Sequence, residues 1–255
     1  MKAITLYVPK DTFIYKVDPI TKLFYILTVI LIPIIAPMQF VAYVLIAISL
    51  LIILSGGIFK KVLPIISFSA IILVTVVIIQ GLFKIDNKTA VLSIGPLTFY
   101  KEGLNYAFEI CARVLNILFA FSILVLTTKP SDLIESLVRK GLSPKIGYVL
   151  NSVLQIIPEM TATMGTITDA QRARGLETEG KLSTRIKAFF PLIGPVVMNS
   201  LIATRERAMA LEVRGFNSKN KKTFLNEEFK SPYSRVFRIC LILITILTIL
   251  WRILS

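Results

Sequence analysis

Long apolar runs separated by short charged segments dominate the first half of the chain. Residues 23–54 contain no charged side chain, and one helix of that length would far exceed the hydrocarbon core of a bilayer, about 30 Å. Because Pro37 removes a helical hydrogen-bond donor and Gln39 is polar, this run is expected to turn at residues 36–39 and form two spans. Further spans are predicted at residues 62–83, 107–127 and 237–254.

The remaining segments show other periodicities. Residues 91–100 alternate around Gly95 and Pro96, which predicts a short hairpin outside the hydrocarbon. Residues 132–140 place apolar side chains on one face ahead of Gly141, which is typical of a capped amphipathic helix. Two long helices are predicted at 143–174 and 184–214, each apolar in its first half and polar toward its end. Their internal prolines are candidate hinges: Pro158, Pro191 and Pro195.

Composition and charge indicate the same class of protein. The chain is 55% hydrophobic and 17% charged, with a mean hydropathy of +0.76, which is too apolar for an ordinary soluble domain. The 29 Lys and Arg exceed the 15 Asp and Glu, and most of the basic residues lie in 129–238. Because basic loops are retained in the cytoplasm, the N-terminus and this region are expected to be cytoplasmic. The predicted fold is an all-α polytopic membrane protein with about five transmembrane helices: a membrane domain with four spans at 1–128, a cytoplasmic module of long crossing helices at 129–235, and the last span at 236–255.

The sequence lacks residues that several kinds of enzyme and metal site require. The chain has no His, which excludes His-ligated metals and Ser-His-Asp hydrolysis. Cys111 and Cys240 lie in separate apolar segments and are interpreted as packing groups. Glu109 and Arg113 fall inside the fourth span, where their spacing predicts an ion pair rather than a proton pathway. We therefore expect no metal site, no cofactor and no enzymatic activity on this chain.

The ends of the two long helices share one short motif. Ala170, Arg174 and Gly175 recur 40 positions later as Ala210, Arg214 and Gly215. Arg followed by Gly is a common helix stop, because Gly adopts the left-handed conformation and the cation interacts with the helix dipole. The same cap would hold a guanidinium at a rigid, exposed tip that suits an acidic or carbonyl-lined pocket on another protein. Together the two tips are predicted to form a two-pronged plug.

Two neighbouring segments give weaker signals. Residues 175–182 have the spacing of a phosphate loop, but Leu182 replaces the hydroxyl that Mg²⁺ needs, so nucleotide binding is not expected. The basic segment 219–222 precedes a span and is expected to meet anionic lipid, so no nucleic acid partner is predicted.

With these residues in view, the chain resembles the transmembrane T component of energy-coupling factor (ECF) transporters, the family that includes the corresponding subunit of cobalt and biotin uptake systems. Residues 18–23 resemble the family's Asp-Pro-x-Thr-Lys-Leu segment before the first span, residues 95–98 and 102–104 its outer loop, and residues 127–133 the end of its fourth span. The most specific similarity lies in the paired Ala-Arg-Gly signatures, Ala173-Arg174-Gly175 and Val213-Arg214-Gly215, the second with Val in place of Ala.

The resemblance implies a non-catalytic subunit that couples two ATP-binding-cassette (ABC) ATPases to a membrane-embedded substrate-binding S component. ATP and Mg²⁺ would bind to the ATPases, and the cargo would be a vitamin or a transition-metal ion. The chain would be a multi-pass protein of the plasma (inner) membrane of a prokaryote, surrounded by the lipid bilayer. The implied docking residues are Ala173, Arg174, Gly175, Val213, Arg214 and Gly215, supported by Ala170, Leu176, Ala210 and Phe216.

A second hypothesis comes from a different class of protein, a self-contained membrane channel or secondary transporter. Such a protein would move its substrate alone and without ATP.

Overall fold

The computed structural model describes residues 7–10, 12–36, 39–84, 89–94, 97–176, 181–218, 220, 223–224 and 232–254. It divides into two compact units, Val138–Glu227 with Met1–Ile4, and Thr5–Leu137 with Glu228–Ser255. We call the first the helix-pair unit and the second the bundle unit. The assignment of residues 1–128, 129–235 and 236–255 to membrane and cytoplasm stays a prediction.

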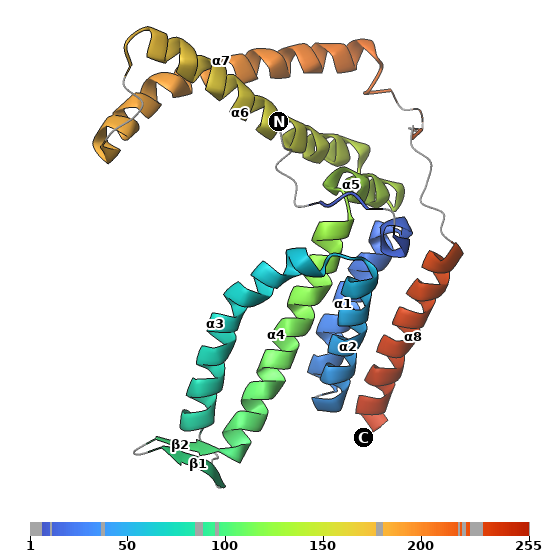
Figure 1. Ribbon diagram of the computed structural model, residues 1–255. Coiled ribbons are helices and arrows are strands. Elements are labelled where there is room, and N and C mark those ends of the chain that lie inside the picture. The colour runs from blue at the N-terminus through green and yellow to red at the C-terminus, as the bar shows by residue number, and fades with distance from the viewer. Residues whose placement is uncertain are drawn as a thin grey trace. The chain divides into compact units, whose positions relative to one another are not determined.

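The bundle unit contains a short 3₁₀ helix and long apolar helices. Its elements are η1 (Phe13–Lys16), α1 (Pro19–Ile35), α2 (Gln39–Ser55), α3 (Phe59–Phe83), α4 (Lys101–Thr127), most of α5 (Pro130–Arg139), and α8 (Pro232–Leu254). Helix α4 packs against α1, α2 and α3, while α8 packs on α1 (Figure 1). Helix α1 ends at Ile35 and α2 begins at Gln39, which confirms the predicted turn between the first two spans.

Apolar clusters and a few polar contacts hold these helices together. Among the described residues, many of the buried apolar side chains gather in two clusters: Ile14, Ile53, Ile58, Val62, Phe119, Ile123 and Leu126 in one, and Ile26, Val29, Ala120 and Leu124 in the other. Fully buried Asn116 on α4 donates from Nδ2 to the carbonyl oxygen of Ala42 on α2 at 2.9 Å. The hydroxyl oxygens of Tyr25 and Ser49 lie 2.7 Å apart and join α1 to α2. In an apolar bundle, such hydrogen bonds help to decide which helices pair.

The outer faces of the bundle unit are apolar. Phe68 and Ile71 on α3 are 74% and 69% exposed, and Leu247 on α8 is 62% exposed. Within the described residues, four helical segments are long and apolar enough to cross a membrane: Phe59–Phe83, Lys101–Thr127, Ala188–Val213 and Tyr233–Leu254. Three of them are predicted spans. Helices α1 and α2, at 17 residues each, are shorter apolar helices, near the lower limit for one crossing. The all-α polytopic class is confirmed.

A hairpin connects α3 to α4, as the alternation of residues 91–100 predicts. Strands β1 (Ala90–Ile94) and β2 (Leu97–Tyr100) pair antiparallel, with Ser93 opposite Thr98 and Ile94 opposite Leu97. Its predicted Gly-Pro turn lies outside the described residues. Helix α4 begins directly after the hairpin, at Lys101 rather than near residue 107. Its Glu102 carboxylate accepts hydrogen bonds from the backbone N–H and hydroxyl of Thr89, which anchors the hairpin on α4.

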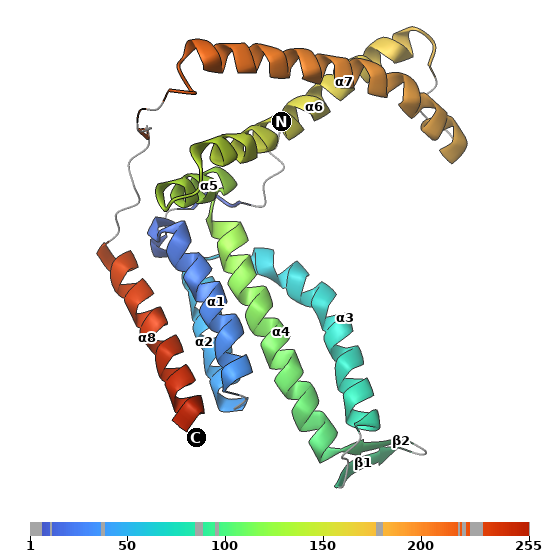
Figure 2. The same cartoon turned by 180° about the vertical axis from the view of Figure 1, so that it is seen from behind.

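The helix-pair unit consists mainly of two long helices that cross, α6 (Pro144–Ala173) and α7 (Leu182–Val213) (Figures 1 and 2). Pro144 stands at the start of α6, where a missing N–H costs no helical bond. Pro158 lies inside α6, and Pro191 and Pro195 lie inside α7. Helix α7 is visibly bent in its first half (Figure 2), which fits two internal prolines there.

Candidate functional site

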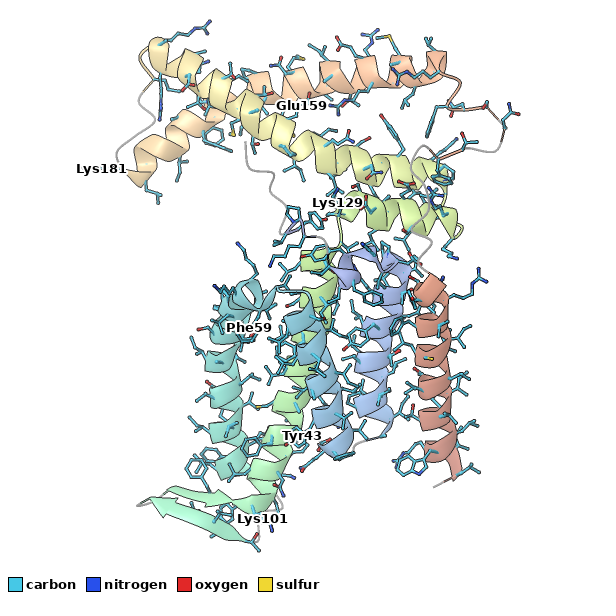
Figure 3. The ribbon with its side chains drawn as sticks, turned by 45° about the vertical axis from the view of Figure 1, so that its right-hand side comes forward. Tyr43, Phe59, Lys101, Lys129, Glu159 and Lys181 are labelled. Carbon is cyan, nitrogen blue, oxygen red and sulfur yellow. The ribbon has the colours of Figure 1, made fainter. Side chains whose placement is uncertain are left out.

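An ion pair and an apolar stripe mark the place where α6 and α7 cross. The guanidinium of Arg207 on α7 pairs with the carboxylate of Glu159 on α6, which Figure 3 labels at the crossing. Around them lies a pocket of about 210 Å³ whose walls include Ile156 and Val196. Ala188, Leu192 and Val196 are buried at intervals of four residues along one face of α7. The crossing is thus fixed by apolar packing and one ion pair, a role for Glu159 and Arg207 that the sequence pattern alone did not reveal.

The two helix ends have the same hydrogen-bonded cap. At the end of α6, Leu176 N–H donates to Gln171 C=O at 3.0 Å and Gly175 N–H donates to Arg172 C=O at 2.9 Å. At the end of α7, Phe216 N–H donates to Leu211 C=O at 3.0 Å and Gly215 N–H to Glu212 C=O at 2.9 Å. This pair of bonds defines the Schellman motif. The 40-residue sequence repeat is therefore also a repeat of backbone geometry.

Glycine makes both caps possible. The φ angles of Gly175 and Gly215 are +88° and +68°, in a region that residues with a Cβ rarely adopt. No atom lies within 4 Å of a Cβ built on either glycine. The constraint at both positions is therefore the backbone conformation and not the available space.

The predicted docking residues are all accessible at these tips. Arg174 and Arg214 are exposed, as are Ala173, Gly175 and Gly215, and Val213 is 89% exposed. Among the described residues, neither Arg174 nor Arg214 makes a side-chain hydrogen bond or ion pair. Five guanidinium donors at each tip are thus left for water or a partner.

The residues predicted to support the tips behave in two ways. Leu176 and Phe216 are half-buried, as expected for the residue that follows a Schellman glycine. The ring of Phe216 packs against Tyr148 of α6 with centroids 5.3 Å apart, so the second tip is braced by the first helix. Ala170 and Ala210 are exposed and thus form part of the accessible surface beside the arginines.

The two tips lie far from each other within the helix-pair unit. Figures 1 and 2 show that α6 and α7 end at opposite ends of the pair. The crossing therefore sets the two predicted prongs apart, and their insertion into partner pockets stays a prediction. The arrangement offers two separate sites of equal design.

Large apolar side chains stay exposed on the first halves of both helices. On α6 they include Ile146, Val149 and Val153, at 51%, 57% and 48% exposure. On α7, Phe190 is 69% exposed and Met198 is 59% exposed. Such an extended apolar surface is typical of contact with a membrane or a partner protein.

A further polar cluster lies in the bundle unit, around the segment of residues 18–23. Lys22 is only 5% exposed, and its Nζ donates to Thr127 O at 3.1 Å, Thr127 Oγ1 at 2.8 Å and Thr128 Oγ1 at 3.1 Å. The structure therefore brings together two of the segments, 18–23 and 127–133, that carry the resemblance to T components.

The same segment also binds α8. The Asp18 carboxylate accepts from Ile20 N–H at 3.3 Å and caps α1, and it lies 3.8 Å from the guanidinium of Arg238. Thr21 Oγ1 donates to the carbonyl oxygen of Ser234 at 3.3 Å. Residues 18–22 thus connect α1 to both α4 and α8, a structural role that sequence spacing could not reveal.

The charged pair predicted in the fourth span is confirmed. The Arg113 guanidinium pairs with the Glu109 carboxylate one turn away, with 35% and 17% of their side chains exposed. Cys111 is buried and Cys240 is exposed, and both are free thiols. Among the described residues, no group of three or more His, Cys, Asp or Glu is arranged to hold a metal ion.

The apolar helices of the bundle unit, together with four described segments of the chain that are long and apolar enough to cross a membrane, define the class of protein: a polytopic α-helical membrane protein. The chain belongs to the cobalt transport protein family (CbiQ), whose profile matches residues 10–224.

Curated relatives carry the name energy-coupling factor transporter transmembrane protein EcfT. The chain is 29% identical to the protein of Lactococcus lactis over 260 residues, covering 96% of each chain. It is 29% identical to that of Clostridium kluyveri over 272 residues, covering 99% of this chain and 98% of the relative. It is 30% identical to that of Listeria innocua over 232 residues, covering 85% of each. The resemblance to ECF transmembrane components is thereby confirmed.

Proposed function

We propose that this chain is the transmembrane coupling subunit of an ECF-type ABC importer. It links ATP hydrolysis by two partner ATPases to the uptake of a vitamin or transition-metal ion through a partner S component. The observation that carries the proposal is the pair of identical caps on α6 and α7, each with an exposed arginine that has no ion-pair partner among the described residues. The names of the curated relatives support membership of such a transporter.

Each tip is proposed to dock in one ATPase. The cap fixes the backbone at Arg174 and Arg214, so little conformational entropy is lost when the guanidinium enters a pocket. A guanidinium bound by carboxylate or carbonyl oxygens forms charge-assisted hydrogen bonds, each worth about 1.5–3 kcal/mol. Because the two tips lie at opposite ends of the helix pair, two ATPases can bind at the same time. Ala173, Gly175, Val213 and Gly215 would form the surface around each arginine.

The crossing transmits motion between the two docking sites in this proposal. Closure of the ATPases around ATP would move the tips, and a helix pair held by Glu159, Arg207 and apolar packing would pass the movement on as a unit. Pro158, Pro191 and Pro195 are the proposed positions of bending. ATP and Mg²⁺ would be bound by the ATPases, so the chain itself would have neither a cofactor nor catalytic residues.

The exposed apolar surfaces are proposed to contact the S component and lipid. The first halves of α6 and α7 and the outer face of α3 present side chains that require an apolar neighbour. The proposed location is the plasma (inner) membrane of a prokaryote, with the N-terminus and the helix pair in the cytoplasm.

The test replaces both arginines. In the double variant Arg174→Glu, Arg214→Glu, we expect ATPase binding to fall by about 100-fold or more, because two charge-assisted contacts become repulsive. Co-purification from detergent-solubilised membranes and substrate uptake by cells are the measurements. A matched control is Lys60→Glu with Lys61→Glu, which makes the same change of charge at exposed positions of α3, outside the helix-pair unit.

The outcomes separate the two classes of function. If the ATPases remain bound and uptake persists in the tip variant, the coupling proposal is wrong. If the purified chain alone moves substrate into liposomes without ATP, it is a self-contained channel or secondary transporter. A further variant with Lys at both tips tests whether the planar guanidinium is needed, because Lys keeps the charge but loses the bidentate geometry.

A further inference from the structure

A basic pocket lies in the bundle unit, at the end where α1 begins and α4 ends. Its volume is about 180 Å³, and its walls include Lys10, Lys16, Lys22, Lys129, Tyr15 and Asp132. Figure 3 labels Lys129 at this end of α4. The proposed coupling mechanism makes no use of this pocket.

The charges around the pocket favour an anion. Four lysines and one aspartate line it, a formal excess of three positive charges. Lys22 is buried and its three ammonium donors are directed to Thr127 and Thr128, so its ammonium is held in the wall of the pocket. Burial raises the pKa of the Asp132 carboxyl above its usual value, although Lys129 and Lys22 oppose that shift. Burial therefore disfavours the one negative charge among the described residues that line the pocket.

The lysines differ in how free they are to bind a ligand. The Nζ of Lys10 donates to the carbonyl oxygen of Gly57 at 2.6 Å. The Nζ of Lys129 lies over the ring of Tyr7, 5.6 Å from its centroid, and Lys16 is exposed. Because a cation over an aromatic ring keeps its N–H donors, Lys129 and Lys16 are the groups best able to bind an anion directly.

Tyr15 also lines this pocket, and its hydroxyl has no partner among the described residues. The Oη atom of Tyr15 is inaccessible to water and makes no hydrogen bond among the described residues. A buried hydroxyl without a partner is costly, so a shift of the Tyr15 ring that lets the hydroxyl donate to an acceptor oxygen in the pocket would be favourable. The ring of Tyr15 packs edge-on against Tyr7 with centroids 6.0 Å apart.

We propose that this pocket binds a phosphate group, and that the phosphate is the headgroup of an anionic phospholipid. Phosphate oxygens accept from lysine ammonium groups and from a tyrosine hydroxyl. The position of the pocket favours a lipid as the source of the phosphate. The pocket lies where α1 begins and α4 ends, and the residues of both helices next to these ends are mostly apolar. A lipid bound there would extend its acyl chains along the exposed apolar side chains of the bundle. This inference does not depend on the proposed coupling function.

The experiment uses the full-length chain in nanodiscs that contain phosphatidylcholine with a minor fraction of phosphatidylglycerol. The phosphatidylglycerol retained after extraction into detergent is measured by mass spectrometry. The pocket variant is Lys16→Gln with Lys129→Gln, and Tyr15→Phe is a second variant that keeps the ring. The control is Lys60→Gln with Lys61→Gln, which removes two exposed lysines from the start of α3 outside the pocket.

We expect wild type to retain phosphatidylglycerol selectively, with a loss of about fivefold for each pocket lysine removed. Tyr15→Phe should also lower retention, and the Lys60, Lys61 control should match wild type. Equal losses of phosphatidylglycerol in the pocket and control variants would mean that general surface charge causes the retention, and would overturn the proposal. A wild type that retains no phosphatidylglycerol selectively would overturn it as well.

A second arm distinguishes the source of the phosphate. Inorganic phosphate is added to the protein in a zwitterionic detergent free of anionic lipid, and the unfolding temperature is recorded. We expect no change in the unfolding temperature of wild type at phosphate concentrations that leave the unfolding temperature of the Lys60, Lys61 control variant unchanged. A rise that is lost in the pocket variant, without selective lipid retention, would assign the pocket to a soluble phosphate and overturn the lipid assignment.

Discussion

At the scale of single residues, Gly175 and Gly215 control where the two tip arginines are held. Both have positive φ angles and open space around them. A Cβ at such a position costs about 1–2 kcal/mol through the backbone alone. Gly165, in the middle of α6, also has open space but an ordinary helical backbone, so it is a natural control.

Replacing these glycines by alanine should therefore have opposite effects. Gly175→Ala or Gly215→Ala is expected to destabilise the helix end by about 1 kcal/mol and to weaken ATPase binding with the arginine unchanged. Gly165→Ala should stabilise α6 by up to about 1 kcal/mol. Unfolding temperature and ATPase co-purification measure the two effects. If all three variants behave alike, the positive φ angle does not control the tip.

Lys22 is the second residue whose replacement has a specific consequence. Lys22→Met keeps an unbranched side chain one atom shorter and removes the bonds from Nζ to Thr127 and Thr128. We expect a loss of about 2 kcal/mol, because buried acceptors lose a charged donor. Thermal unfolding of the detergent-solubilised protein is the measurement, with the exposed Lys60→Met as control. Equal stability of the two variants would show that the Lys22 contacts contribute nothing.

At the scale of elements, the crossing of α6 and α7 includes an ion pair between residues 48 positions apart, Glu159 and Arg207. The side chains are 53% and 33% exposed, so solvent weakens their attraction and apolar packing carries most of the contact. The ion pair therefore acts mainly on the register of the two helices.

A double-mutant cycle tests this interpretation. Glu159→Arg and Arg207→Glu should each destabilise the pair, and the combined variant should recover part of the loss. The expected coupling is about 0.5–1 kcal/mol, as for other partly exposed pairs. Unfolding temperature and uptake are measured in parallel. Arg205→Glu, at an exposed position of the same helix, provides the control, and additive effects of Glu159→Arg and Arg207→Glu would argue against direct coupling.

At the scale of the whole molecule, consecutive apolar helices run in opposite directions (Figure 1), and this alternation of direction defines a membrane topology. Lys60 in the first turn of α3 and Lys101 in the first turn of α4 lie at opposite ends of the bundle unit (Figure 3, with Phe59 and Lys101 labelled). The distribution of Lys and Arg predicts that the end with Lys60 faces the cytoplasm.

Cysteine labelling tests this topology. In a background with Cys111→Ala and Cys240→Ala, the variant Lys101→Cys should react with a membrane-impermeant maleimide in intact cells. Lys60→Cys should react only after the membrane is permeabilised. Both positions are exposed, so access by the reagent depends on the side of the membrane. The reverse pattern would invert the predicted orientation, and labelling of both in intact cells would contradict an α3 that crosses the bilayer.

The sequence by itself determined the elements and the family. The charge-free run of residues 23–54, the alternation of residues 91–100 and the repeated Arg-Gly ends are local patterns, and hydrophobicity, period and glycine conformation act over a few residues. These patterns predicted the paired helices, the hairpin and both caps.

Only the tertiary structure decided which distant residues meet. No local pattern encodes the contacts that join different helices. Examples are Lys22 with Thr127, Thr21 with Ser234, Tyr148 with Phe216, and Glu159 with Arg207. The separation of the two tips has the same origin. Each cap is specified within about six residues, whereas the distance between the caps depends on the angle at which two long helices cross, and that angle is set by side-chain packing.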